Sequence, residues 1–338
     1  MKKIKFVLAV FLAAMSVNAM AKDSVAVEKS EVKRIETTKV EPKGKAIVSV
    51  FANYNMTMQN GVEKCGFQLE RSYLGYEYSL GNGLQLKAVM DIGKPSSVDD
   101  YHYVAYIKNA QVSWKHEGLT LTGGMISTTQ FNMQEKFWGY RYIYKSFQDQ
   151  YKFGSSADLG LSVVYKFADW VSADAIMTNG EGYKKIQGDK GFQYGLGLTF
   201  VPVDGLSVRL YGGLNDATAE GKANVYNYAT FVGYKHKMFS LGGEFAMMQN
   251  SGNVENRNQL GCSVYGSVKA HKIVDVYARW DMLTSNNGWN AAKDEQAVIA
   301  GAQVKLGKYV KVAPNFRMTI PKEGDNEYMA YVSCYFGL

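Results

Sequence analysis

The sequence predicts an all-β fold, a transmembrane antiparallel β-barrel of sixteen strands with a long third external loop folded inward. Segments of about 9 to 13 residues alternate apolar and polar side chains, which is typical of strands. The connections between these segments alternate short and long, as in outer-membrane barrels. The chain also holds 34 Gly and 24 Tyr but only 5 Pro, a balance that favours strands and tight turns.

The N-terminal residues 1–21 have the features of a secretory signal. They combine a basic start, an apolar run that ends at Met15 and the cleavage pattern Ala19-Met20-Ala21. A transmembrane anchor is the alternative, but this run is far shorter than the roughly 20 residues of a spanning helix. No other long apolar run follows and the mean hydropathy is -0.22, which excludes a helical membrane protein.

The remaining chain divides into a charged lead-in, residues 22–45, and a barrel, residues 46–338. The lead-in has no aromatic residue, and we expect it to be a solvated periplasmic segment. Of the formal net charge of +7, the signal contributes three lysines, the lead-in has seven basic against five acidic residues, and the barrel has 28 against 26. The barrel's excess lies within residues 130–153, which hold four basic and two acidic residues. The charge therefore marks one segment and not a nucleic-acid-binding surface.

Alternation of apolar and polar side chains assigns the two faces of most strands. In residues 272–284 the even-numbered positions from Val274 to Met282 are apolar, whereas Asp275 and Asp281 lie on the other face. Residues 66–80 are the exception, because the adjacent Glu70 and Arg71 break the alternation and leave these faces unassigned. The predicted strands are 46–58, 66–80, 84–93, 106–117, 119–128, 157–168, 170–178, 192–202, 205–215, 225–236, 238–249, 259–269, 272–284, 295–306, 308–320 and 326–338.

A soluble β-sandwich also alternates, so strand length and connections must decide between the two. Strands of globular proteins are usually about 5 or 6 residues long, whereas tilted spanning strands need about 9 to 11. The short turns begin with residues 81–83, and the longest connection covers residues 129–156. An even number of strands places both ends of the barrel on the periplasmic side. The last strand ends at Leu338, where outer-membrane proteins usually end in Phe.

Charged side chains on the polar face require a wet lumen, since charges facing lipid are costly. Sixteen strands enclose enough space for an aqueous channel. The residues predicted to line the lumen wall are Arg209, Arg279, Lys311 and Arg317.

The longest connection contains EKFWGYRYIYK, residues 135–145, the densest aromatic and basic cluster of the chain. A loop that folds inward needs rings to pack against the wall and cations to face the passage. An aromatic girdle on an extended strand is one alternative. Binding of single-stranded nucleic acid is another, but export of the protein argues against it. The residues predicted for the pore constriction are Lys136, Trp138, Tyr140, Arg141, Tyr144, Lys145 and Lys152.

The run from Phe131 to Tyr142, followed by Asp149-Gln150 and SSADLG at 155–160, resembles the porin O and P family, the phosphate-selective porins and their relatives. The resemblance covers the barrel from about residue 46 to the end and depends mainly on this loop. It implies a sixteen-stranded trimeric porin with an inward third loop and an anion preference. The best-known members line their pore with many arginines, whereas the inward arginines here are few and mixed with acids.

Enzymatic chemistry finds little support in the sequence. The three cysteines lie far apart, and we expect them to be free, with Cys262 and Cys334 on the apolar faces of their strands. No His lies at a metal-ligand spacing from another His or a Cys. Ser113 and His116 are close in sequence, but alternation places them on opposite faces. We therefore expect no enzyme activity, metal or cofactor.

These observations predict an outer-membrane porin of a Gram-negative-type envelope that admits small hydrophilic solutes by passive diffusion, with a modest anion preference. Its expected partners are outer-membrane lipid, small hydrophilic or anionic solutes and two further copies in a homotrimer, and not nucleic acid. A substrate-specific oligosaccharide or phosphate channel is one alternative, and a closed structural or adhesive barrel is the other.

Overall fold

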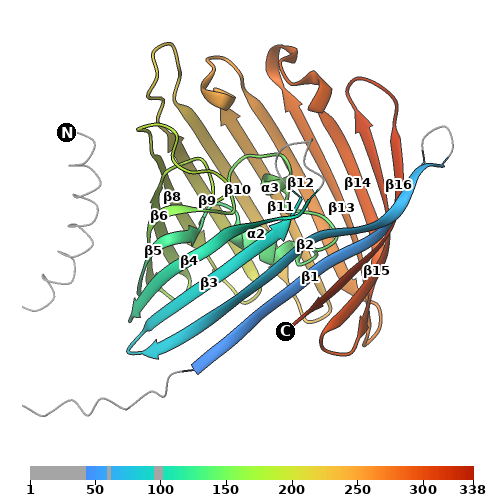
Figure 1. The fold of residues 1–338 in the computed structure, drawn as a ribbon, viewed down its shortest axis with the longest axis horizontal. Coiled ribbons are helices and arrows are strands. Elements are labelled where there is room, and N and C mark those ends of the chain that lie inside the picture. The colour runs from blue at the N-terminus through green and yellow to red at the C-terminus, as the bar shows by residue number, and fades with distance from the viewer. Residues whose placement is uncertain (1–42, 59–61, 95–101) are drawn as a thin grey trace, which may run out of the picture. The chain divides into compact units, whose positions relative to one another are not determined.

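The strands form one closed antiparallel barrel, in which each strand bonds to its neighbours in sequence and β1 closes onto β16 (Figure 1). The structure is a computed structural model that describes residues 43–58, 62–94 and 102–338. The predicted signal and nearly all of the predicted lead-in lie outside the described residues. Within them, no helix is long and apolar enough to span a membrane. The predicted fold class, a barrel of sixteen strands, is confirmed.

The strand boundaries agree with the predicted ones to within a few residues. The first eight strands are β1 (Lys43–Met58), β2 (Val62–Gly81), β3 (Leu84–Gly93), β4 (Val104–His116), β5 (Leu119–Ser127), β6 (Ala157–Ala168), β7 (Val171–Thr178) and β8 (Gln193–Phe200). The others are β9 (Leu206–Asn215), β10 (Val225–Lys235), β11 (Phe239–Gln249), β12 (Gln259–Lys269), β13 (Val274–Ser285), β14 (Glu295–Leu306), β15 (Val310–Pro321) and β16 (Glu327–Gly337). Short helices are α2 (Asn132–Trp138), α3 (Phe147–Gln150), η1 (Ser251–Asn253), η2 (Asn286–Gly288) and η3 (Ala291–Lys293).

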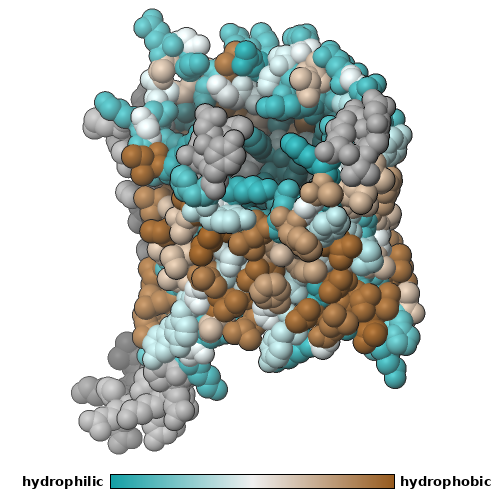
Figure 2. All heavy atoms as spheres, turned by 45° about the vertical axis from the view of Figure 1, so that its right-hand side comes forward, coloured by the Kyte–Doolittle hydropathy of each residue, from teal (hydrophilic) through white to brown (hydrophobic). Residues whose placement is uncertain are grey.

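The outer surface of the barrel is apolar across its middle. Large hydrophobic side chains such as Val264 and Phe316 point outward and are exposed, whereas Asp281 points inward and is fully buried. Figure 2 shows hydrophobic residues gathered in a band on the wall and hydrophilic residues above it, around a hollowed mouth. Such an apolar band is the surface that contacts lipid in an outer-membrane barrel. In lipid, only a closed sheet gives every backbone N–H and C=O group a hydrogen-bond partner. Cys262 and Cys334 lie on this outer face, and all three cysteines are free, as predicted.

A β-bulge explains why alternation fails in β2. Phe51 of β1 pairs with Arg71 and Ala52 pairs with Leu69, so Glu70 has no partner in the ladder. The extra residue lets two consecutive side chains turn toward the lumen. There Glu70 accepts a hydrogen bond of 3.0 Å from the Asn53 amide, and Arg71 lies 3.1 Å from Asp91.

The third long connection, residues 128–156 and hereafter L3, enters the barrel and carries α2 and α3 (Figure 1). Three of its aromatic side chains, Phe131, Phe147 and Phe153, are at most 1% exposed. Phe147 and Phe153 pack against apolar inward residues of the wall, which are Tyr211, Val225, Ala229, Ala246, Met248 and Leu283. The predicted inward folding of this loop is thus present, and burial of aromatic surface stabilises it.

Candidate functional site: the narrowed lumen

Arg209 of β9 fixes the start of L3. Its guanidinium donates hydrogen bonds of 2.7 and 3.0 Å to the two carboxylate oxygens of Asp174 and another of 2.7 Å to the Thr129 carbonyl. Both charged side chains are nearly buried, at 5% and 7% exposure. The pair therefore holds the loop and is not a free charge in the passage.

Arg279 of β13 fixes the middle of L3. It forms two hydrogen bonds of 2.7 and 2.6 Å with Asp281 and donates a third, of 2.6 Å, to the Lys145 carbonyl. The side chains of Arg279 and Asp281 have no exposed surface. Since a buried ion pair is retained only when its hydrogen bonds are satisfied, the loop carbonyl is an integral part of this pair.

Arg317 of β15 also fixes the middle of L3, two residues before the carbonyl that Arg279 binds. It donates a hydrogen bond of 2.7 Å to the Ile143 carbonyl and lies 3.5 Å above the Tyr331 ring. Arg209, Arg279 and Arg317 all point inward as predicted, but each binds a loop carbonyl. The fourth predicted wall residue, Lys311, lines a hollow nearer the short turns.

The aromatic residues of L3 pack on the wall. Trp138 is 2% exposed, meets Tyr265 and Tyr277 edge to face, and donates a hydrogen bond of 2.8 Å to the Tyr144 carbonyl. Tyr140 stacks on Tyr277 with ring centroids 4.5 Å apart. The aromatic girdle considered as an alternative is therefore wrong, because these rings lie inside the lumen.

Residues after Trp138 leave the helix at Gly139, whose φ of 71° is left-handed and suits glycine. Arg141 and Lys145 therefore lie outside this helix. Arg141 instead pairs with Glu135 at 3.3 Å and Asp149 at 3.0 Å.

Arg141 also reaches the opposite wall, where three cations meet at the Tyr73 hydroxyl. The distances to this oxygen are 2.9 Å from Arg71, 3.2 Å from Lys108 and 3.3 Å from Arg141. This contact marks the point at which L3 approaches β2 and β4. Alternation could not reveal Arg71 and Lys108, because each lies at or beside a bulge.

The predicted lysines of the constriction are more open. Lys136, Lys145 and Lys152 are exposed, and none has a salt bridge within the described part of the chain. Lys145 and Arg141 border a hollow of about 230 Å³ together with Glu70 and Arg71. Lys136 borders a second hollow of about 240 Å³ toward the short turns, with Lys235, Lys269, Lys305 and Lys311. Lys235 and Lys269 were not predicted, although alternation at the strand ends could have placed them inward.

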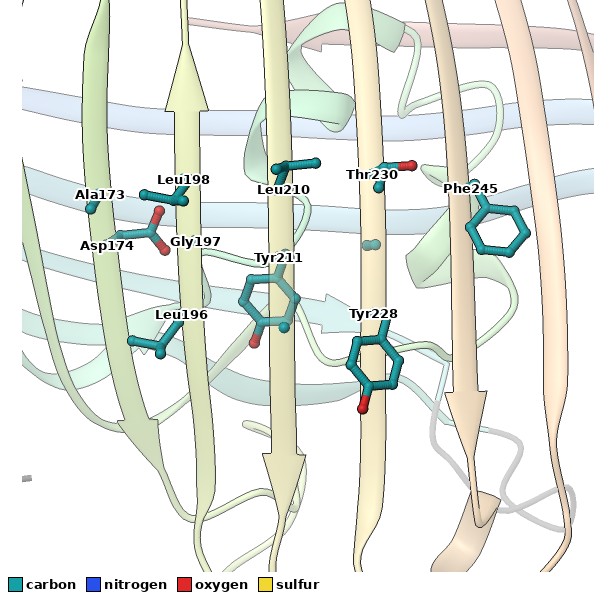
Figure 3. A pocket seen from close by; sticks show the side chains of 12 residues that line it. Ala173, Asp174, Leu196, Gly197, Leu198, Leu210, Tyr211, Tyr228, Thr230 and Phe245 are labelled. Atoms are coloured by element: carbon teal, nitrogen blue, oxygen red, sulfur yellow. The ribbon is translucent and has the colours of Figure 1, made fainter. Parts of the chain in front are cut away.

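A third hollow lies on the outer surface, over β7 to β11 (Figure 3). Outward side chains such as Leu196, Leu210 and Phe245 line its volume of about 510 Å³. It faces lipid and is not part of a route for solutes. Among the described residues, no three His, Cys, Asp or Glu side chains are grouped to hold a metal ion.

Acidification is expected to loosen L3 through Asp149. Burial alone would raise the pKa of this carboxyl, but Arg141 and Lys145 outweigh burial and lower the pKa below the ordinary 3.8. Its stabilisation is therefore complete above 3.8 and is lost as pH falls through the lower folded-state pKa. We expect current fluctuations to increase at pH values below 3.8, and an Asp149→Asn channel to show them already at neutral pH. Equal noise in both proteins at every pH would contradict this role.

A closed sixteen-stranded barrel with an apolar exterior and a loop bound inside its lumen is the architecture of a general outer-membrane porin. Solved structures share it at low sequence identity. OmpF of Salmonella typhi in complex with daunomycin is 12% identical with a TM-score of 0.69, over 87% of this chain and 97% of that one. A trimer form of OmpT of Vibrio cholerae is 17% identical with a TM-score of 0.62, over 88% and 99%. An anion-selective porin from Comamonas acidovorans is 13% identical with a TM-score of 0.66, over 88% and 100%.

No protein-family model and no curated protein sequence matches the chain. The fold shared with these solved porins is a closed barrel, as predicted. The narrower resemblance to the porin O and P family gains no support from these comparisons.

Proposed function

We propose that the protein is a passive diffusion channel of the outer membrane for small hydrophilic solutes, with a modest preference for anions. The observation that carries the proposal is L3, which is bound inside the lumen by Arg209, Arg279 and Arg317 of the wall. In this proposal the loop narrows the lumen, and solutes are selected by size at the narrowed level.

The anion preference rests on the balance of charge along this passage. Arg71, Lys108 and Arg141 meet on one side of it, and Lys136 and Lys145 stand exposed nearby. Asp91, Glu135 and Asp149 offset part of this charge through their pairs with Arg71 and Arg141. The remaining positive potential concentrates small anions near the constriction. The anion selectivity named for the similar Comamonas porin agrees with this proposal.

A homotrimer is part of the proposal, and the trimer form of the similar Vibrio OmpT supports it. A substrate-specific oligosaccharide channel is less well supported, because Trp138 and Tyr140 are buried against the wall and their rings are not available for stacking with a sugar. Membership in the porin O and P family would favour phosphate, but three of the inward arginines bind the loop.

Reconstitution into liposomes tests passive diffusion. We expect the swelling rate with uncharged sugars to fall smoothly as solute size rises, without saturation. Block by an oligosaccharide at low concentration would favour the specific channel. Absence of conductance from purified protein in planar bilayers would favour a closed barrel.

A further inference from the structure

We propose that the Tyr73 hydroxyl occupies a preformed oxyanion site, and that a permeating carboxylate or phosphoryl group takes its place between Arg71, Lys108 and Arg141. The inference rests on the proposed function, because the solute must reach the site through the lumen. Tyr73 then sets how tightly anions are held at the constriction.

The number of donors exceeds what a phenol can accept. A phenolic oxygen has two lone pairs, yet Arg71, Lys108 and Arg141 approach it at 2.9, 3.2 and 3.3 Å. These cations come from β2, β4 and L3. An oxyanion has more lone pairs and a negative charge, so the same geometry suits it better.

The acids beside this point equal the three cations in number, but among the described residues none of them forms a salt bridge with Lys108. Arg71 pairs with Asp91, and Arg141 pairs with Glu135 and Asp149. The Lys108 ammonium donates to the Tyr73 hydroxyl at 3.2 Å and lies 4.6 Å from the Tyr73 ring and 5.6 Å from the Tyr183 ring. Like charges gathered around a neutral oxygen repel one another, and a bound anion would relieve the repulsion.

A β-bulge turns Lys108 into the lumen. Val89 of β3 pairs with Asn109 and Met90 pairs with Ile107, so Lys108 has no partner in the ladder. Ile107 is 59% exposed toward lipid while Asn109 is 3% exposed, so the bulge adds one inward side chain between them. The bulge at Glu70 in β2 and the bulge at Lys108 in β4 thus both lie beside the Tyr73 hydroxyl. Bulges are typical of places where a side chain must be re-aimed.

The connection between β7 and β8 completes the site. Its Tyr183 hydroxyl hydrogen-bonds to Asp91, and its ring stands beside Lys108. Lys184 follows, with its ammonium 4.6 Å from the Tyr106 ring. The adjacent hollow of about 230 Å³, bordered by Arg71 and Arg141, leaves room for the rest of a small solute.

Tyr73→Phe tests the site, because it removes the hydroxyl and keeps the ring that packs edge to face on Phe51. Single-channel chloride currents are recorded with phosphate or malonate added, as a phosphoryl and a carboxylate probe. We expect both probes to block the Tyr73→Phe channel at about tenfold lower concentration than the wild type, since three charged donors are freed. Lys108→Gln should weaken the block, and Tyr335→Phe, which removes another inward hydroxyl, should leave it unchanged.

Unchanged or weaker block in Tyr73→Phe would overturn the inference. Stronger block by one probe alone would assign the site to that chemistry. Failure of the proposed function looks different, because the wild-type protein itself would then show no conductance or a cation preference.

Discussion

Replacing Arg279 by Met is expected to destabilise the barrel by about 3 to 5 kcal/mol and to free L3 from the wall. The substitution leaves Asp281 charged and fully buried without a partner, and the Lys145 carbonyl loses its donor. Trp138 also loses the guanidinium that lies 5.0 Å from its ring. Urea unfolding in detergent measures the stability, and single-channel recording should show a larger, noisier current because the loop no longer holds one position.

Two further variants separate the contributions. In Arg279→Met with Asp281→Asn the buried charge is gone, so most of the stability should return while the current stays noisy. Arg257→Met, in an exposed connection where the guanidinium lies 5.8 Å from the Trp289 ring, should change stability by less than about 0.5 kcal/mol. A single Arg279→Met channel with wild-type stability and current would show that the arginine does not anchor L3.

Neutralising Arg141 and Lys145 together should reduce or reverse the anion preference. Removal of Arg141 also leaves Glu135 and Asp149 without their partner, so the change in local charge is larger than the two substitutions alone suggest. A unit charge at 4 Å contributes about 1 kcal/mol even in bulk water. We therefore expect Arg141→Gln with Lys145→Gln to lower the chloride-to-potassium permeability ratio about fivefold or more at low salt.

Lys222→Gln with Lys293→Gln is the matched control. Both lysines are exposed in connections at the long-loop end and change the net charge equally. The control should keep the wild-type permeability ratio. If both double variants shift the ratio equally, the overall charge of the protein and not the constriction sets selectivity.

The barrel could be predicted from the sequence because its signal is local. Alternation placed Arg209, Arg279 and Arg317 on the inner face, and their inward direction in the structure agrees. Bulges at Glu70 and Lys108 interrupt this period of two, so the faces around Glu70 could not be assigned and Lys108 was not predicted to line the lumen.

The contacts of L3 with the wall could not be predicted from the alternation of side chains within single strands. The hydrogen bonds that Arg279 and Arg317 donate to loop carbonyls join residues 134 and 174 positions apart. Backbone acceptors carry no mark in the sequence, so these arginines were expected to face the passage. The pairing of Arg141 with two acids likewise depends on the turn after Gly139.

The zero-current potential of the purified protein in a planar bilayer, measured across a KCl gradient, tests the central claim most directly. If the cations of L3, β2 and β4 line the narrowed lumen, the conductance should be stable and the zero-current potential should have the sign expected when chloride permeates faster than potassium. A potential of the sign set by potassium would contradict that account.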